Sequence, residues 1–245
     1  MYYYLVTIYL VIIFITTSLT FLPIAVVLRV FTGWFDRKLK ILHVFSCFWA
    51  SCYIWLSPLW RVTITGRENV EKNKAYVMIS NHQSMLDILV VYYSFLHFKW
   101  VAKASLFKAP IIGWNMYLNR YIKIERSSLK SQRKMIRQCG ENIMKGNSVM
   151  IFPEGTRSKT GELKRFKEGA FLIALQQKSD IIPMVIDGSS EALPESGFFF
   201  RTKKHIKLHI LPAIMYESYK DMNADQLSIH TYQIVEKELN SMRES

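Results

Sequence analysis

Short apolar runs of strand length alternate with segments of helical periodicity from residue 61 to residue 243 of this 245-residue chain. Some runs are continuous, as in strands buried on both faces, and others alternate with polar residues, as in half-buried strands. The expected strands cover residues 61–65, 75–80, 99–103, 121–125, 148–152, 180–187 and 204–211. The expected helices cover residues 87–96, 104–118, 128–146, 167–177 and 223–243, the second interrupted by Pro110 and Gly113. This alternation predicts an α/β fold with a central mixed sheet flanked by helices.

The first 60 residues differ from the rest because they hold two long apolar segments. Residues 1–28 and 41–60 contain no Asp, Glu, Lys or Arg. A bilayer crossing takes about 20 apolar residues, and residues 5–28 are long enough even with Pro23 near their end. The second segment is rich in Trp, Tyr and Phe, which favour the membrane interface. The sequence therefore predicts a membrane-anchoring two-helix segment over residues 1–60, followed by one α/β domain over residues 61–245.

The basic residues between the two apolar segments bear on how the chain meets the membrane. Residues 29–40 hold four basic residues and one acidic residue, and positive charge prefers the cytoplasmic side of a membrane. We therefore expect one crossing or a shallow hairpin, with residues 41–60 in the interface and the α/β domain on the cytoplasmic face of the inner or plasma membrane. An ordinary two-span hairpin is the alternative.

The charge of the whole chain limits its partners. It carries 32 Lys and Arg against 19 Asp and Glu, a formal net charge of +13, which suits an anionic membrane surface. We expect no nucleic acid partner, because zinc-finger spacing, RNA-binding signatures and basic heptads are missing from the sequence. The three cysteines form no Cys-x-x-Cys pair, and an odd number is no disulfide framework. Cys47 and Cys52 are expected to be small apolar fillers.

A polar stretch, SNHQSMLD at residues 80–87, stands between two apolar runs. His82 follows an expected buried strand, and Asp87 lies in the first turn of the next expected helix. Residues five apart do not share a helix face, so the histidine must lie in the loop and the chain must turn for Asp87 to meet it. Such a carboxylate holds one imidazole nitrogen while the other accepts a proton from a hydroxyl. The alternative is that Asp87 caps the helix and His82 satisfies loop carbonyls.

A second polar turn, PEGTRS at residues 153–158, follows another expected buried strand. Gly155 lets the backbone approach a ligand closely. Thr156 offers a hydroxyl and Arg157 a bidentate fork, which match a phosphate monoester. Glu154 does not bind phosphate, but it could accept a hydrogen bond from a substrate hydroxyl or position Arg157. The alternative is a surface turn with an internal Glu–Arg pair.

Together these stretches resemble the blocks of the glycerolipid acyltransferase family, especially its lysophospholipid acyltransferases. The first block, Asn-His-x-x-x-x-Asp, is matched by residues 81–87, and the third, Phe-Pro-Glu-Gly-Thr-Arg-Ser, by residues 152–158. The second resembles YIKIERS at residues 121–127, although Glu125 replaces the usual Asp. The segment LKRFKEGAF after the third block and the strand IIPMVI complete the resemblance. The blocks lie between residues 80 and 187 in the family's order and spacing.

The resemblance implies acyl transfer from an acyl thioester to the free hydroxyl of 1-acylglycerol-3-phosphate, which gives phosphatidic acid. It implies that His82 acts as general base and that Asp87 orients and stabilises the imidazole, without a nucleophilic Ser or Cys, a metal or a cofactor. The implied substrate-binding residues are Asn81, Arg126, Glu154, Gly155, Thr156, Arg157, Lys167 and Pro183. The implied partners are acyl carrier protein or coenzyme A as carrier of the donor, lysophosphatidic acid as acceptor, and membrane phospholipid.

Other functions stay open on the sequence. A related acyltransferase would use another acceptor, such as lyso-ornithine lipid or glycerol-3-phosphate, and a thioesterase would use the same His–Asp pair on water. A non-catalytic membrane-binding protein would keep only the anchor. A metal site made from His82, His205 and His209 is a further alternative. His205 and His209 alternate with apolar residues on an expected strand, which favours an ordinary solvated face.

Overall fold

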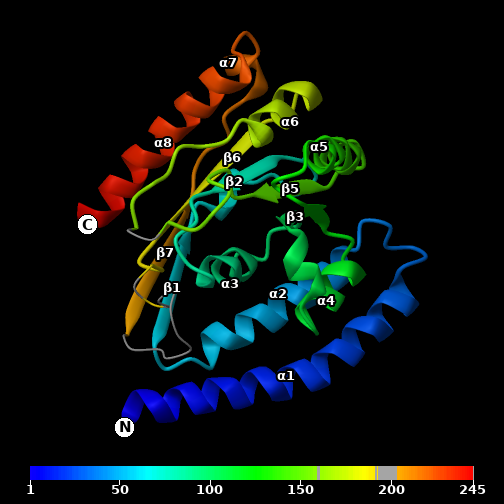
Figure 1. The fold of residues 1–245 in the computed structure, drawn as a ribbon, viewed down its shortest axis with the longest axis vertical. Coiled ribbons are helices and arrows are strands. Elements are labelled where there is room, and N and C mark those ends of the chain that lie inside the picture. The colour runs from blue at the N-terminus through cyan, green and yellow to red at the C-terminus, as the bar shows by residue number, and fades with distance from the viewer. Residues whose placement is uncertain (159–160, 191, 193–202, 245) are drawn as a thin grey trace.

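A seven-stranded mixed sheet lies at the centre of the computed structural model, which describes residues 1–158, 161–190, 192 and 203–244 (Figure 1). The strands are β1 (Trp60–Thr65), β2 (Val77–Ser80), β3 (Phe98–Lys103), β4 (Ile122–Ile124), β5 (Ser148–Ile151), β6 (Ile181–Asp187) and β7 (Lys204–Ile210). Their order is β1-β7-β6-β2-β5-β3-β4. Strands β6 and β7 pair antiparallel, and the other neighbours pair parallel. The predicted α/β fold with a mixed sheet is confirmed.

The helices cover both faces of this sheet. They are α1 (Tyr2–Thr32), α2 (Lys40–Trp55), α3 (Leu86–Tyr93), α4 (Ile112–Leu118), α5 (Leu129–Met144), α6 (Gly169–Gln177), α7 (Tyr216–Tyr219) and α8 (Ala224–Glu244), with 3₁₀ turns η1 (Arg67–Asn69) and η2 (Ala104–Lys108). The helix expected over residues 104–118 is divided into η2 and α4. Pro110 lies between them, and a proline cannot donate the backbone hydrogen bond that a continuous helix needs.

Successive side chains of the central strands point to opposite faces of the sheet and pack in two separate hydrophobic cores. Met78 of β2 and Met150 of β5 belong to the core that includes residues of α1, α2 and α3. Val77 and Ile79 of β2 point to the opposite core, which includes residues of α5, α6 and α8. The continuous apolar runs in the sequence are therefore strands buried on both faces.

Helices α1 and α2 form an antiparallel hairpin along one side of the molecule (Figure 1). Aromatic pairs connect them, with Phe14 against Tyr53 and Phe21 against Trp49. Helix α2 also packs on α3, and its buried His43 bonds to Tyr121 at 2.9 Å and to the carbonyl of Leu96 at 2.9 Å. In the described part of the chain, α1 is the one helix long and apolar enough to cross a membrane, and its mostly exposed apolar surface indicates membrane association.

Candidate active site

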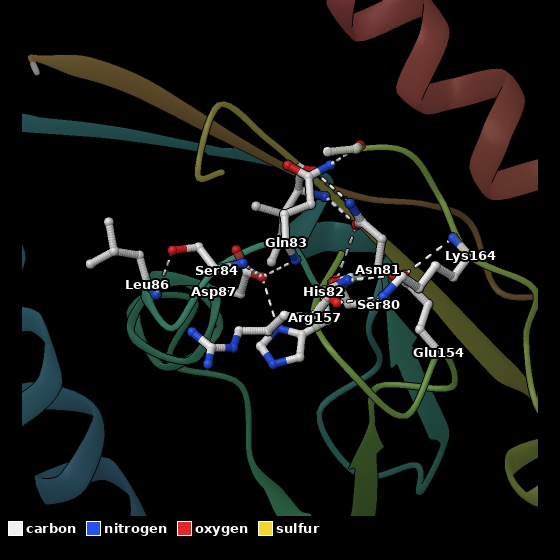
Figure 2. Close-up of polar contacts among 12 residues, drawn as sticks. Ser80, Asn81, His82, Gln83, Ser84, Leu86, Asp87, Glu154, Arg157 and Lys164 are labelled. Carbon is white, nitrogen blue, oxygen red and sulfur yellow. Dashed lines mark hydrogen bonds and ion pairs between the residues drawn. The ribbon is translucent and has the colours of Figure 1, made fainter. Parts of the chain in front are cut away.

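His82 lies in the loop between β2 and α3, and Asp87 lies in the first turn of α3, as the sequence predicts. The Nδ1 atom of His82 is 2.8 Å from Oδ2 of Asp87. Figure 2 shows that the other ring nitrogen, Nε2, points away from the carboxylate. A carboxylate on Nδ1 selects the tautomer with its proton on that atom, because a carboxylate can only accept. Nε2 is then free to accept a proton from a ligand.

The loop itself is shaped around the Asp87 carboxylate. Oδ2 of Asp87 also accepts the backbone N–H groups of Gln83 at 2.6 Å and Ser84 at 2.8 Å. The Asp87 side chain is fully buried, whereas His82 keeps 9% of its surface exposed. Burial keeps water from competing for the carboxylate, so the imidazole is held in one orientation with only its outer edge accessible.

Glu154 fixes the backbone of His82 from the neighbouring turn. Its Oε1 accepts the N–H of His82 at 2.7 Å, and its Oε2 accepts the N–H of Lys164 at 3.2 Å. The carbonyl of His82 in turn accepts the N–H of Ser158 at 2.8 Å. Both backbone groups of His82 are thus held by the turn after β5. Figure 2 shows Glu154 beside the His82 loop. Burial raises the pKa of Glu154 to about 7, against the lowering effect of the two N–H donors.

The side-chain amide of Asn81 forms hydrogen bonds to the backbone of the sheet. Its Nδ2 donates to the carbonyl of Ile186 at 2.8 Å, and its Oδ1 accepts the N–H of Ile186 at 2.8 Å. The paired bonds tie the start of the His82 loop to the end of β6. The Asn81 side chain thus satisfies the backbone N–H and C=O of Ile186, as the backbone of a neighbouring strand would.

Phe152 lies flat against the imidazole of His82. The ring centroids are 4.0 Å apart and the planes differ by 10°. Phe152 also contacts Trp100, with centroids 5.4 Å apart. One face of the imidazole is therefore covered by an aromatic ring, which excludes water from that side and restricts rotation of the histidine.

The turn after β5 holds the residues expected to bind phosphate. Gly155 has a left-handed backbone with φ 76, and a Cβ there would lie 3.0 Å from Cε of Lys167. A side chain at this position would be strained by the positive φ and would push Lys167 aside by a few tenths of an ångström, so the backbone conformation accounts for the glycine. Lys167 lies over this turn and its N–H donates to the carbonyl of Pro153 at 2.9 Å. Thr156 is exposed and Arg157 is half-buried.

A cavity of about 320 Å³ opens beside His82 and is lined mainly by apolar side chains. Its walls come from α1, α2, α3, β3, η2 and α4, and include Trp49, Ala50, Leu89 and Met116. Arg126, which follows β4, lines it as well. This volume is within the usual range for sites that take small organic ligands, about 300–1,000 Å³.

Among the eight predicted substrate-binding residues, Arg126 lines this cavity, whereas Asn81, Glu154, Gly155, Thr156, Arg157, Lys167 and Pro183 do not. Pro183 is buried in β6 opposite Ile79 and does not line the cavity. His205 bonds through Nε2 to Thr63 at 2.8 Å, and His209 bonds through Nδ1 to Glu238 at 2.6 Å. Neither histidine approaches His82 in these contacts, and the described residues contain no group of three His, Cys, Asp or Glu placed to hold a metal ion.

Sequence reasoning missed Phe152 as a partner of the histidine ring. The aromatic residue at the end of an apolar run looks like any other core residue, so no local signal marks it. The role of α2 is different, because the sequence runs from residues 41–60 into β1 without a linker rich in Gly or Ser. This continuity predicts that the segment packs on the domain and borders the space for acyl chains, and residues of α2 do line the cavity.

Comparison with known proteins gives a family match and several named relatives. The Acyltransferase family model matches residues 61–187, just over half of the chain. Over 180 residues the chain is 36% identical to 1-acyl-sn-glycerol-3-phosphate acyltransferase LPAT1, chloroplastic, of Arabidopsis thaliana, which covers 72% of this chain and 50% of that protein. Over 145 residues it is 40% identical to 1-acyl-sn-glycerol-3-phosphate acyltransferase of Saccharomyces cerevisiae, which covers 57% of this chain and 48% of that protein.

The chain spans about half the length of these curated relatives. The crystal structure of the 1-acyl-sn-glycerophosphate (LPA) acyltransferase PlsC from Thermotoga maritima has the same fold. Its TM-score is 0.72 at 20% sequence identity, with 94% of this chain and 96% of that chain covered. The family match and the shared fold lead to one conclusion: this chain belongs to the Acyltransferase family.

Proposed function

We propose that this protein is a membrane-bound 1-acylglycerol-3-phosphate acyltransferase. It moves a fatty acyl group from an acyl thioester to the free hydroxyl of lysophosphatidic acid and so forms phosphatidic acid. The observation that carries the proposal is the position of His82, whose Asp87-paired imidazole lies at the edge of an apolar cavity that also contains Arg126. The names of the relatives in Arabidopsis and yeast support this acceptor.

His82 supplies the base for the reaction. Its Nε2 takes the proton of the acceptor hydroxyl while the hydroxyl oxygen attacks the thioester carbonyl. The tetrahedral intermediate collapses, the carbon–sulfur bond breaks, and the imidazolium returns the proton to the leaving thiolate. Asp87, held by Gln83 and Ser84, keeps the proton on Nδ1 and stabilises the transient positive charge.

The phosphate of the acceptor is held by basic side chains around the histidine. Arg126 lines the cavity. Thr156 and Arg157 belong to the turn that is bonded to the His82 loop, and Lys167 donates its N–H to that turn. Each charge-assisted hydrogen bond to phosphate contributes roughly 1.5–3 kcal/mol. Arginine also offers the planar fork that fits phosphate oxygens. In this proposal Asn81, Glu154 and Gly155 shape the His82 loop and the turn after β5. The basic side chains contact the phosphate.

The apolar cavity receives an acyl chain. Trp49, Ala50, Leu89, Trp100 and Met116 give it aliphatic and aromatic walls from several elements. An acyl chain in this space displaces water, and burial of each methylene is worth about 0.8 kcal/mol. The same exclusion of water protects the thioester from hydrolysis and favours transfer to the lipid hydroxyl.

The hairpin brings this site to the lipid. We propose that α1 lies in the membrane along its exposed apolar side and that the α/β domain sits on the cytoplasmic face. Because α1 runs antiparallel along α2, and α2 packs on α3, a perpendicular crossing by α1 would draw the domain into the bilayer. The acyl donor, a carrier protein or coenzyme A thioester, then arrives from the aqueous side.

An acceptor panel tests the proposed reaction. Full-length protein in neutral detergent is given a palmitoyl thioester with lysophosphatidic acid, glycerol-3-phosphate, lysophosphatidylcholine or lyso-ornithine lipid, and products are identified by mass spectrometry. We expect phosphatidic acid to form fastest. Preference for another acceptor, or acceptor-independent release of free fatty acid, would replace the proposal with a different acyltransferase or a thioesterase.

Truncation tests the role of the hairpin. Removal of residues 1–60 takes away α2, whose Trp49 and Ala50 form part of the cavity wall, so we expect residues 61–245 to aggregate or to be inactive. Removal of residues 1–28 leaves α2 in place and should be milder. A monodisperse, active fragment of residues 61–245 released from membranes by centrifugation would show that the hairpin is only a tether.

A further inference from the structure

A second cavity, of about 190 Å³, lies at the end of the sheet where β3, β4 and β5 begin. Its walls come from the α1–α2 loop, these strand beginnings and α5. The His82 loop follows the opposite, carboxyl end of the parallel strand β2, and the two cavities share no lining residue. The basic residues Arg37, Lys99, Arg120 and Lys145 line this second cavity, which we call the basic cavity.

Lys99 is the most unusual of these residues because it is almost fully buried, with 3% of its surface exposed. Its Nζ donates to the carbonyl of Asn119 at 3.2 Å. In the part of the chain that the structure describes, no carboxylate forms an ion pair with it. Burial is the main cause that lowers the pKa of Lys99 to about 8; Asp36 partly opposes the lowering, and Arg120 contributes to it. A buried ammonium group without an anionic partner is unfavourable, and an anion in the cavity would relieve that cost.

Arg120 is a second basic residue of this cavity. It lies between α4 and β4 and has a left-handed backbone with φ 54. Glycine or asparagine adopts this conformation more readily than arginine. This backbone closes the C-terminus of α4, because the N–H of Arg120 donates to the carbonyl of Tyr117 at 3.0 Å and the N–H of Tyr121 donates to the carbonyl of Met116 at 3.1 Å. A position that usually holds glycine thus carries an arginine whose side chain lines the basic cavity.

The charge around the basic cavity is predominantly positive. The single acidic residue among its lining residues, Glu141, pairs with Arg137 on the same helix at 3.7 Å. A neighbouring cavity of about 470 Å³ shares Arg120 and adds Lys123, Lys130 and Lys134, and its described lining contains no acidic residue. Both cavities thus favour an anion with several acceptor oxygens.

The surroundings of the cavity indicate where this anion comes from. The chain just before Arg37 carries Phe31, Trp34 and Phe35, which are 70%, 79% and 54% exposed. Exposed aromatic residues beside basic ones are typical of the membrane–water interface. Lys38 ties this loop to the domain, because its Nζ donates to the carbonyl of Gly146 at 3.3 Å. The cavity therefore lies at the depth of lipid headgroups when these aromatic residues enter the bilayer.

We infer that the basic cavity binds the phosphate of an anionic membrane phospholipid. This lipid is separate from the reacting lipid at His82, and its site holds the base of the α/β domain against the membrane. The site requires only a phosphate with a net negative headgroup, so its occupancy does not depend on the proposed reaction.

Native mass spectrometry of the full-length protein in neutral detergent tests this site. The protein is titrated with dioctanoyl phosphatidylglycerol, with dioctanoyl phosphatidylcholine, and separately with inorganic phosphate. We expect one retained phosphatidylglycerol molecule, weaker retention of phosphatidylcholine, and no competition from inorganic phosphate at equal concentration. The double variant Arg120→Asn with Lys145→Gln, and Lys99→Met alone, should each weaken the apparent Kd about tenfold or more.

Two controls distinguish binding in the basic cavity from general charge attraction and from binding at the active site. Lys72→Gln with Lys237→Gln removes the same charge from two exposed positions outside both cavities, and its Kd should stay within about twofold of wild type. His82→Ala should bind phosphatidylglycerol normally. Because asparagine tolerates the left-handed backbone, Arg120→Asn should keep or raise the melting temperature while binding falls.

The inference is overturned if wild-type protein retains no phosphatidylglycerol, or if the Lys72/Lys237 control loses as much binding as the cavity variant. Equal competition by inorganic phosphate would also contradict it, because the site would then take a soluble anion rather than a lipid.

Discussion

Nδ1 of His82 lies 2.8 Å from Oδ2 of Asp87, and the same oxygen accepts the backbone N–H groups of Gln83 and Ser84. One carboxylate oxygen therefore both closes the loop and orients the ring. This double role explains how a histidine and an aspartate five residues apart can meet although they share no helix face.

Replacement of Asp87 by Asn tests this relationship. The amide oxygen can still accept the N–H groups of Gln83 and Ser84, so the loop should keep its shape and the melting temperature should change little. The charge that supports the imidazolium is lost, and we expect kcat to fall on the order of 10³-fold or more. Steady-state kinetics beside a thermal melt measures both effects. Near-normal turnover in a folded Asp87→Asn variant would remove the carboxylate from the mechanism.

The proposed phosphate contacts make a prediction about the acceptor. Arg126→Ala and Arg157→Ala should each raise KM for lysophosphatidic acid on the order of tenfold to a hundredfold, because each loses a charge-assisted bond. KM for the acyl donor serves as the internal control and should stay near its wild-type value. An unchanged KM for lysophosphatidic acid in both variants would place the phosphate elsewhere.

The cavity wall predicts chain-length preference. Ala50 lines the cavity on α2, and Ala50→Phe should reduce kcat/KM for a sixteen-carbon donor much more than for an eight-carbon donor. Val44 lies on the same helix but is 47% exposed, so Val44→Phe is the matched control and should leave the ratio unchanged. If both variants behave alike, the acyl chain lies outside this cavity.

Glu154 gives a pH dependence with a defined sign. Its pKa is raised from 4.5 to about 7, chiefly by burial, so the folded state favours the protonated form. The free energy of unfolding of the wild type, relative to Glu154→Gln, should fall as pH rises from about 4.5 to about 7, because the carboxyl ionises in the unfolded chain while the folded chain still holds its proton. Chemical denaturation in detergent at several pH values measures the difference. A difference that is flat across this window, or that rises, would contradict the raised pKa.

The fold was largely predictable because its signals are local. The central strands are continuous apolar runs, and the two faces of β2 feed two cores through Val77, Met78 and Ile79. Their short length and the polar turns that follow them favour strands buried on both faces over helices. The division of residues 104–118 into η2 and α4 was harder, since Pro110 marks an interruption without fixing where the new helix begins.

The site was predictable only where its residues are close in sequence. The His82–Asp87 pair follows from its spacing within one loop. Glu154 holds the backbone of His82, 72 residues away, and Asn81 pairs with Ile186, 105 residues away. Such partners are set by how strands pair in the sheet, so the sequence could suggest ligand roles for Asn81 and Glu154 but not their contacts.

The same limit applies to the cavity. Trp49 and Ala50 of α2 meet Met116 of α4 only because the hairpin packs on the domain. Composition indicated that residues 41–60 are apolar, and it could not say which of them face lipid and which face the cavity.

The most direct test of the proposed mechanism is the rate of phosphatidic acid formation by purified full-length His82→Ala beside wild type, with lysophosphatidic acid and a palmitoyl thioester in neutral detergent. We expect a loss on the order of 10³-fold or more with an unchanged melting temperature and no covalent acyl-enzyme in intact-mass spectra of either protein. Phosphatidic acid formation by His82→Ala at near the wild-type rate, or an acyl group trapped on the wild-type chain during turnover, would contradict the mechanism.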